Sequence, residues 1–275
     1  MVPHSPATRD HSVPVSALVR ASHPWGDVEL AQLYDAFPFR ADLPLYLALA
    51  AAQGGQVLDV ACGSGRVLVP LARAGHRVVG LDASPHMLAL ARRKLANEGL
   101  EHARLVHGDM RHFLGLLDET FDLAIVAAKS FAYLTERAEQ ARALACIAAH
   151  LRPGGLLALD LLHPRPAWLA VPPGSLTQDL VERAPSLGAT VARTEAVVST
   201  DLAAQTRVIR SGYEVVADDG SLRKRFVEWS YRITYRFEAE HLLERAGFTV
   251  EAIFGGYQRE PLRSESPTML FLARR

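Results

Sequence analysis

The chain has 275 residues, 49% of them hydrophobic and 22% charged, and its 30 lysines and arginines balance its 30 aspartates and glutamates. This composition excludes a disordered chain, and the length allows one large α/β domain, with or without an insertion. The neutral balance offers no basic field for a nucleic acid, and no stretch approaches the roughly 20 apolar residues that span a bilayer. We therefore expect no nucleic acid and no membrane among the partners.

The N-terminal segment and the cysteines bear on location. Residues 1–26 lack the apolar run of a secretory signal, and we expect them to form a flexible arm. Cys62 and Cys146 are the only cysteines, and Cys62 lies inside a glycine loop, which argues against a disulfide framework and against a metal site built from thiolates. The expected location is the cytoplasm.

The first elements after the arm are helical. Apolar residues recur at helical spacing from Val28 to Ala51 with a break near Pro38, so two helices should precede the first strand. Short apolar strands then alternate with helices, which predicts a doubly wound, Rossmann-like sheet with helices on both faces. The strands are expected at about 57–60, 78–81, 104–107, 122–127 and 156–161, and the helices at about 66–74, 85–98, 111–115 and 136–150.

The first strand runs into Asp59 and then into a turn that carries Gly63 and Gly65. Glycine at both positions permits positive φ and lets the backbone approach a ligand closely, while the helix that follows presents its amide end to the same point. A nicotinamide or flavin site would want a third glycine where this chain has Leu68. Asp59 ahead of the glycines also suits a ligand amine and would repel a pyrophosphate.

Two further strands also end in acids. The second strand is followed by Asp82, at about the distance at which a carboxylate holds a ribose in doubly wound folds. The third is followed by Asp109 and Met110, where the acid can accept a hydrogen bond from an adenine amino group. The three strand ends together predict a site for a nucleoside with a charged tail.

This series of motifs resembles that of the class I S-adenosylmethionine-dependent methyltransferases, over about residues 30–165 and again from about 239. The fourth strand and the Leu151–Gly155 turn into the fifth continue the resemblance. It implies S-adenosylmethionine as cofactor, with the first acid and the glycine loop on the methionine part, the second acid on the ribose and the Asp-Met pair around adenine. The cofactor-binding residues that it implies are Asp59, Ala61, Gly63, Gly65, Arg66, Asp82, Ala83, Met87, Asp109, Met110 and Lys129.

After the fifth strand the pattern changes. Residues 227–237 alternate apolar and polar side chains, which predicts a strand with one apolar and one solvated face, and 206–216 and 191–199 are its expected neighbours. We interpret residues 167–237 as an antiparallel β insertion after strand five, a flap for acceptor binding or dimerisation. Residues 27–166 and 238–275 then form the S-adenosylmethionine-binding domain, which ends with a helix at 238–246 and strands at 249–254 and 269–273. The fold class is therefore α/β, with a seven-stranded, mostly parallel sheet.

The residues that could carry chemistry follow from the reaction. Methyl transfer to an amine mainly needs alignment and exclusion of water, whereas an alcohol or carbon acceptor also needs a base. His163, after the fifth strand, is the residue best placed to act as a general base. The alternative role for His163 is structural, as part of a turn. Tyr34 resembles a tyrosine that closes over the cofactor in many small-molecule members of the family. The alternative role for Tyr34 is packing of its helix. The expected acceptor-binding residues are Ser130, Tyr133, Trp229, Tyr231 and Tyr257, although the insertion's aromatic residues could instead pack flap against core or subunit against subunit.

The sequence thus predicts an enzyme that moves a methyl group by direct in-line displacement to a nitrogen or oxygen of a small-molecule acceptor. The insertion resembles that of small-metabolite members such as glycine, sarcosine or amino-sugar N-methyltransferases. Two alternatives stay open: a macromolecule methyltransferase, and an S-adenosylmethionine-binding protein of the same fold without methyl transfer. Exposed strand edges in the flap would allow a homodimer.

Overall fold

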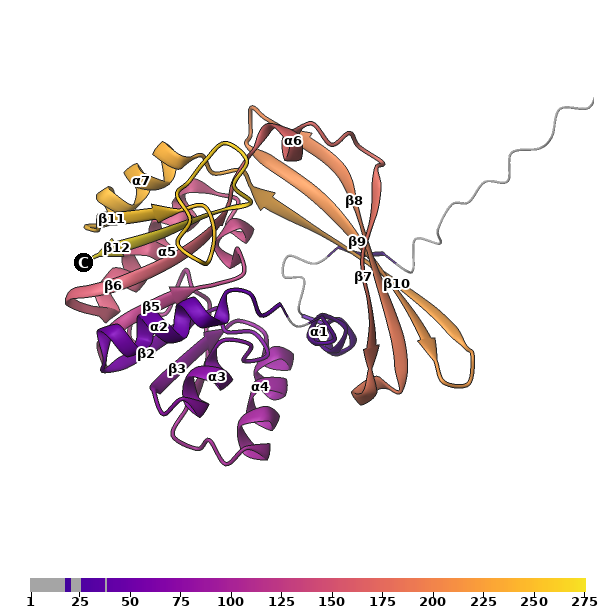
Figure 1. Cartoon of the computed structure of the whole chain (residues 1–275), viewed down its shortest axis with the longest axis horizontal. Coiled ribbons are helices and arrows are strands. Elements are labelled where there is room, and N and C mark those ends of the chain that lie inside the picture. The colour runs from indigo at the N-terminus through magenta and orange to yellow at the C-terminus, as the bar shows by residue number, and fades with distance from the viewer. Residues whose placement is uncertain (1–17, 21–25, 38) are drawn as a thin grey trace, which may run out of the picture.

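The protein is built from two β-sheets that face each other across a short helix (Figure 1). The computed structural model describes residues 18–20, 26–37 and 39–275. Most of the arm expected at residues 1–26 lies outside these residues. Leu18–Arg20, however, form strand β1, which pairs in parallel with the flap strand β10 (Leu222–Arg232).

The first sheet has seven strands in the order β11-β12-β6-β5-β2-β3-β4. Strand β12 runs opposite to the other six strands, so the sheet is mostly parallel and the expected fold class is confirmed. The strands are β2 (Gln56–Val60), β3 (Arg77–Asp82), β4 (Arg104–His107), β5 (Phe121–Val126), β6 (Leu151–Leu162), β11 (Thr249–Phe254) and β12 (Thr268–Arg274).

Helices cover both faces of this sheet, as the alternation of strands and helices requires. On one face the core is filled from α5 (Arg137–His150) and α7 (Arg236–Arg245). On the other face it is filled from α2 (Leu43–Gln53), α3 (Leu68–Arg73) and α4 (Pro85–Asn97). With both faces covered, the central strands are mostly apolar, and the carboxyl ends of the parallel strands meet at one edge.

The second sheet is the insertion, with the strand order β1-β10-β9-β8-β7. Its long strands are antiparallel neighbours: β7 (Leu176–Ala184), β8 (Ala189–Asp201), β9 (Thr206–Ala217) and β10. One face of this flap packs against helix α1 (Val28–Asp35) in a separate apolar core that includes Leu30, Leu33 and Phe37. Helix α1 also packs on α4 through Ala31, so it lies between the two sheets.

Two expected elements differ in the structure. Residues 111–115 form turns and no helix, because five residues with a glycine at the end are too few to sustain one. The strand expected at 227–237 is β10, which begins earlier and ends at Arg232. Tyr235 and Phe237 continue the alternation in sequence, yet they precede and open α7 and are 43% and 66% exposed. Strands β1 and β7 were not expected.

None of the helices in the described ranges is both long and apolar enough to cross a membrane. Cys62 and Cys146 are both buried, and neither forms a disulfide. Among the described residues, no group of three or more histidines, cysteines or acids is arranged to hold a metal ion.

Candidate functional site

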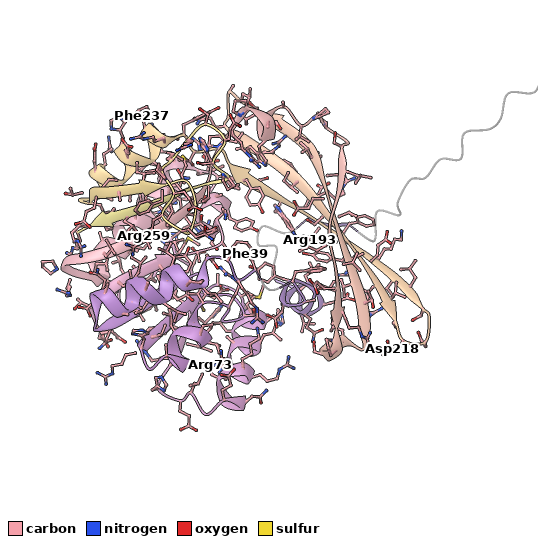
Figure 2. All side chains as sticks on the ribbon, viewed as in Figure 1. Phe39, Arg73, Arg193, Asp218, Phe237 and Arg259 are labelled. Atoms are coloured by element: carbon pink, nitrogen blue, oxygen red, sulfur yellow. The ribbon has the colours of Figure 1, made fainter. Side chains whose placement is uncertain are left out.

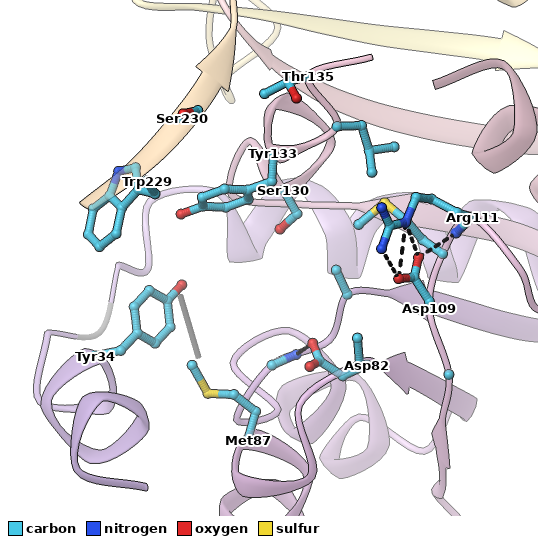
Figure 3. Close-up of a pocket in the computed structure, with 16 residues that line it drawn as sticks. Tyr34, Asp82, Met87, Asp109, Arg111, Ser130, Tyr133, Thr135, Trp229 and Ser230 are labelled. Atoms are coloured by element: carbon cyan, nitrogen blue, oxygen red, sulfur yellow. Dashed lines mark hydrogen bonds and ion pairs between the residues drawn. The ribbon is translucent and has the colours of Figure 1, made fainter. Parts of the chain in front are cut away.

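A cavity of about 320 Å³ opens at the carboxyl edge of the parallel sheet, between the core and the flap. Turns after β2, β3, β4 and β5 form its floor, and α1 and β10 close it from the other side (Figure 3). Its walls are formed by Tyr34, Ala61, Gly63, Asp82, Ala83, Met87, Gly108, Asp109, Met110, Arg111, Ser130, Tyr133, Leu134, Thr135, Trp229 and Ser230.

The glycine turn after β2 faces this cavity. Ala61, Gly63 and Gly65 all have positive φ, of 59°, 56° and 82°, so the chain reverses sharply here. A Cβ added at Gly63 would meet no atom within 4 Å, which means that the missing side chain leaves open space beside the backbone. Gly65 instead packs toward Val69 and Ala91, and it is not part of the cavity wall.

Asp82 ties the glycine turn to the turn after β3. One carboxylate oxygen accepts a hydrogen bond of 2.8 Å from the Gly63 backbone N–H, and the other accepts one of 2.8 Å from the Ser84 N–H. The carboxylate is therefore fixed between the two turns at the cavity wall. Met87, at the start of α4, lines the same cavity, and its side chain extends toward Tyr34 (Figure 3).

Asp109 is held by Arg111, a residue that was not among the predicted site residues. The Arg111 guanidinium lies 2.6 Å from Asp109 and also contacts Glu139 of α5. Burial alone would raise the pKa of Asp109, but the hydrogen bonds from Arg111 lower it below its usual value. Arg111 lies only two positions after Asp109, yet nothing in that spacing indicated that it would fold back onto the cavity.

Asp59 lies beneath the glycine turn and does not reach the cavity wall. It is 1% exposed, and its Oδ2 has no hydrogen-bond partner. Burial raises the pKa of Asp59 to about 7, while the nearby charge of Arg66 opposes the shift. The Arg66 guanidinium donates to the Asp42 carboxylate, at 2.5 and 2.8 Å, and to the Phe39 carbonyl at 2.9 Å, and it also lies off the wall.

The far end of the cavity is aromatic and uncharged. Tyr34 from α1, Tyr133 from the short 3-10 helix η2 (Ser130–Tyr133) and Trp229 from β10 converge there (Figure 3). The Tyr133 hydroxyl lies 3.4 Å from that of Tyr231, which stands behind it. Burial raises the pKa of both phenols and of Tyr34, so all three stay neutral.

Tyr34 also faces a second cavity of about 320 Å³, formed by the end of α1, the glycine turn, α3 and α4. Its hydroxyl points into the first cavity in Figure 3. The Tyr34 side chain therefore forms part of the wall between the two cavities.

Besides Asp59, Gly65, Arg66 and Tyr231, three further expected site residues lie away from the cavity wall. Lys129 and Tyr257 belong to a network around the buried Asp160, which accepts from Tyr257 at 2.9 Å and lies 3.3 Å from the Lys129 ammonium. His163 makes a 2.8 Å hydrogen bond with the Ser266 carbonyl. This hydrogen bond supports a structural role for His163, which does not line the cavity.

Comparison with known proteins gives the site a context. A family model described as "Methyltransferase domain" matches residues 57–155. The chain is 32% identical over 241 residues to a dTDP-3-amino-3,6-dideoxy-alpha-D-glucopyranose N,N-dimethyltransferase of Streptomyces fradiae, covering 83% of this chain and 87% of the relative. It is 30% identical over 243 residues to a dTDP-3-amino-3,4,6-trideoxy-alpha-D-glucopyranose N,N-dimethyltransferase of Streptomyces venezuelae, covering 84% and 94%.

Solved structures agree with this. The CcbJ methyltransferase of Streptomyces caelestis matches with a TM-score of 0.77 at 24% identity, over 92% of this chain and 98% of the other, a likeness of fold. CalS10, an amino pentose methyltransferase from Micromonospora echinaspora solved with S-adenosylmethionine bound, matches with a TM-score of 0.67 at 26% identity, over 88% and 94%.

Proposed function

Since the chain belongs to the class I S-adenosylmethionine-dependent methyltransferases and acts on a small molecule, we propose that its acceptor atom is the nitrogen of an amine, and specifically of an amino sugar. The observation that carries this proposal is the absence of charge at the acceptor end of the cavity. Among the described residues on the wall, the ionisable side chains that carry charge are Asp82, Asp109 and Arg111, and all three lie at the opposite end.

The cofactor end fits S-adenosylmethionine. The open space beside Gly63 lets a ligand approach the backbone, and Asp59 offers a buried carboxylate oxygen without a partner beneath it. We assign Asp82 to the ribose hydroxyls, Asp109 and Met110 to adenine, and the glycine turn to the methionine part. When bound, S-adenosylmethionine supplies an electrophilic methyl group on a positively charged sulfur.

The acceptor end suits an amine because the lone pair of a neutral amine is nucleophilic enough to attack without prior loss of a proton. A hydroxyl acceptor would need a base to take its proton, whereas a neutral amine attacks unaided and loses a proton later. The described wall at this end offers hydroxyl groups and an indole, from Tyr34, Ser130, Tyr133, Thr135 and Trp229. Such groups orient an acceptor and exclude water, and raised pKa values make the two phenols poor bases.

The relatives support an amino-sugar acceptor in particular. The two dimethyltransferases named above act, by their names, on nucleotide-linked 3-amino sugars, and their similarity to this chain extends beyond the cofactor domain into the flap. A cavity lined with hydroxyl side chains also suits a polyhydroxylated ring, because each hydroxyl can donate and accept a hydrogen bond.

A matched pair of acceptors tests the proposal. The purified protein is incubated with S-adenosylmethionine and either dTDP-3-amino-3,6-dideoxy-glucopyranose or the same compound with a hydroxyl at that carbon. We expect one or two methyl groups on the nitrogen of the amino sugar, detected by mass spectrometry and NMR, and no product from the hydroxyl analogue. Efficient methylation of the hydroxyl analogue would refute the nitrogen assignment.

Several sequence-based expectations stay proposals. We assign residues 27–166 and 238–275 to cofactor binding and the 167–237 insertion to the acceptor, because Trp229 and Ser230 of β10 are on the cavity wall. The homodimer, the cytoplasmic location and the absence of a nucleic-acid partner stay predictions, to be checked by light scattering, fractionation and nucleic-acid titration.

A further inference from the structure

The turn after β5 has a backbone conformation that its sequence does not favour. Ala128 and Lys129 have φ angles of 53° and 58°, and the Ser130 N–H donates a 3.1 Å hydrogen bond to the Ala127 carbonyl. Positive φ at both central residues is typical of a type I′ turn, in which glycine, asparagine and aspartate predominate. Alanine and lysine carry a Cβ that disfavours the left-handed conformation, so this turn is strained.

The strained turn directly precedes two residues of the cavity wall. The short helix η2 begins at Ser130, and Ser130 and Tyr133 both line the cavity. Lys129 is the last residue before η2, and its carbonyl accepts a 2.9 Å hydrogen bond from the Ala132 N–H. The direction of η2, and with it the location of both wall residues, therefore depends on the turn. Strained backbone of this kind persists only where surrounding contacts hold it.

The Lys129 side chain supplies contacts that hold the turn. Its ammonium lies 3.3 Å from the carboxylate of Asp160 on β6, and it also donates a hydrogen bond to the Tyr257 hydroxyl. It lies over the rings of Phe39 and Tyr257, 5.7 and 5.1 Å from their centroids. Phe39 belongs to the connection between α1 and α2, near the junction of core and flap (Figure 2). The charge of Lys129 is thus bound on several sides, away from the cavity wall.

Asp160 is itself fixed, so it can serve as an anchor. The Thr268 hydroxyl, on β12, donates to one carboxylate oxygen at 2.6 Å, and the Tyr257 hydroxyl donates to the other at 2.9 Å. Strand β6 lies between β5 and β12, and the Asp160 side chain is fully buried there. A buried carboxylate that loses its cation carries a large desolvation cost, so separation of Lys129 from Asp160 is strongly disfavoured.

We infer that Lys129 is a positioning residue for the methyl acceptor. Its ion pair with Asp160 offsets the strain of the turn at Ala128 and Lys129. The turn in turn sets the locations of Ser130 and Tyr133, through which Lys129 acts. This role rests on the proposed function, because it takes the wall formed by Ser130 and Tyr133 to be the acceptor end. Without the ion pair, the turn should relax toward negative φ and η2 should shift on the wall.

Two substitutions at one position separate the anchor from the general stability of the protein. Lys129→Met and Lys129→Gly both leave Asp160 without its cation, so both should unfold at a lower urea concentration. Glycine adopts the left-handed conformation at little cost and needs no anchor, whereas methionine keeps the strain. The KM for the amino-sugar acceptor should therefore rise about 10-fold in Lys129→Met and stay within about 3-fold of wild type in Lys129→Gly. The Kd of S-adenosylhomocysteine should change little in either, because the cofactor is assigned to other turns.

Amide hydrogen exchange of residues 127–134 reports on the turn without any acceptor. Exchange should be faster in Lys129→Met than in the wild-type protein. Thr268→Val is the matched control, because it removes a hydrogen bond to Asp160 and leaves Lys129 in place. It should lose stability and keep the wild-type KM and the wild-type exchange of this segment. If a Lys129 variant does not fold, both are made again together with Asp160→Asn, which leaves no lone charge buried.

The failure of this role and the failure of the proposed function give different results. Equal rises of KM in Lys129→Met and Lys129→Gly, a wild-type KM in Lys129→Met, or unchanged exchange in Lys129→Met overturns the positioning role. Methylation of the amino sugar by the wild-type protein would still uphold the proposed function in each of these cases. If the wild-type protein methylates no amine, the proposed function fails, and the role of Lys129 toward the acceptor fails with it.

Discussion

Replacing Asp82 by alanine should weaken cofactor binding and also destabilise the protein. The carboxylate holds two backbone N–H groups at 2.8 Å, those of Gly63 and Ser84, and it is 7% exposed. The sequence motif indicates only the ribose role. The structure adds that the same side chain fixes the shape of the glycine turn.

The two effects can be estimated separately. A buried N–H left without a partner costs about 1–3 kcal/mol, so two of them should lower the free energy of unfolding by about 2–6 kcal/mol. For a domain of this size that corresponds to a fall in Tm of roughly 4–24 °C. Loss of hydrogen bonds from the carboxylate to the ribose should cost about a further 1–3 kcal/mol in binding, or roughly 5- to 150-fold in Kd.

Calorimetric titration with S-adenosylhomocysteine and urea unfolding measure the two quantities. Asp122→Ala is a suitable control, since Asp122 also accepts a backbone hydrogen bond, 2.7 Å from the Gln56 N–H, and pairs with Arg152 away from the cavity. The control should lose stability and keep its affinity for the cofactor. If Asp82→Ala binds S-adenosylhomocysteine as tightly as the wild-type protein, the ribose assignment is refuted.

Three further changes probe other parts of the site. Because the pKa of Asp59 is raised from 3.8 to about 7, the folded state binds more protons between these values, and the free energy of unfolding should fall as pH rises through that window. The total change across the window is up to about 4 kcal/mol, and Asp59→Asn should remove it. Urea unfolding of both proteins at several pH values measures this pH dependence. If the two proteins show the same pH dependence, Asp59 ionises normally. Gly63→Val should abolish S-adenosylhomocysteine binding, because the side chain would occupy the open space beside the turn, and tight binding by this variant would locate the cofactor elsewhere. His163→Ala should lower stability by about 1 kcal/mol through loss of its bond to Ser266, with normal turnover, whereas a selective loss of turnover would restore the role of a base.

The sequence by itself determined the cofactor half of the site. In a parallel sheet every strand delivers the residue that follows it to the same edge, so acids and glycines placed just after successive strands must meet. Gly63, Asp82 and Asp109 could therefore be predicted to converge without knowledge of the packing, and all three lie on one cavity wall. Most core strands could be predicted for the same reason, because each is a short apolar run bounded by turn residues.

Only the tertiary structure decided the acceptor half. Its walls come from α1, η2 and β10, elements far apart in the chain, and no local pattern tells which face of each meets the others. Side-chain rotamers and the docking of the flap turned Arg111 toward the cavity and left His163, Lys129 and Tyr257 outside it. Strand periodicity specifies which residues share a face. The partner of that face depends on how two separately folded layers pack, and this packing placed Tyr231 behind Tyr133 and off the wall.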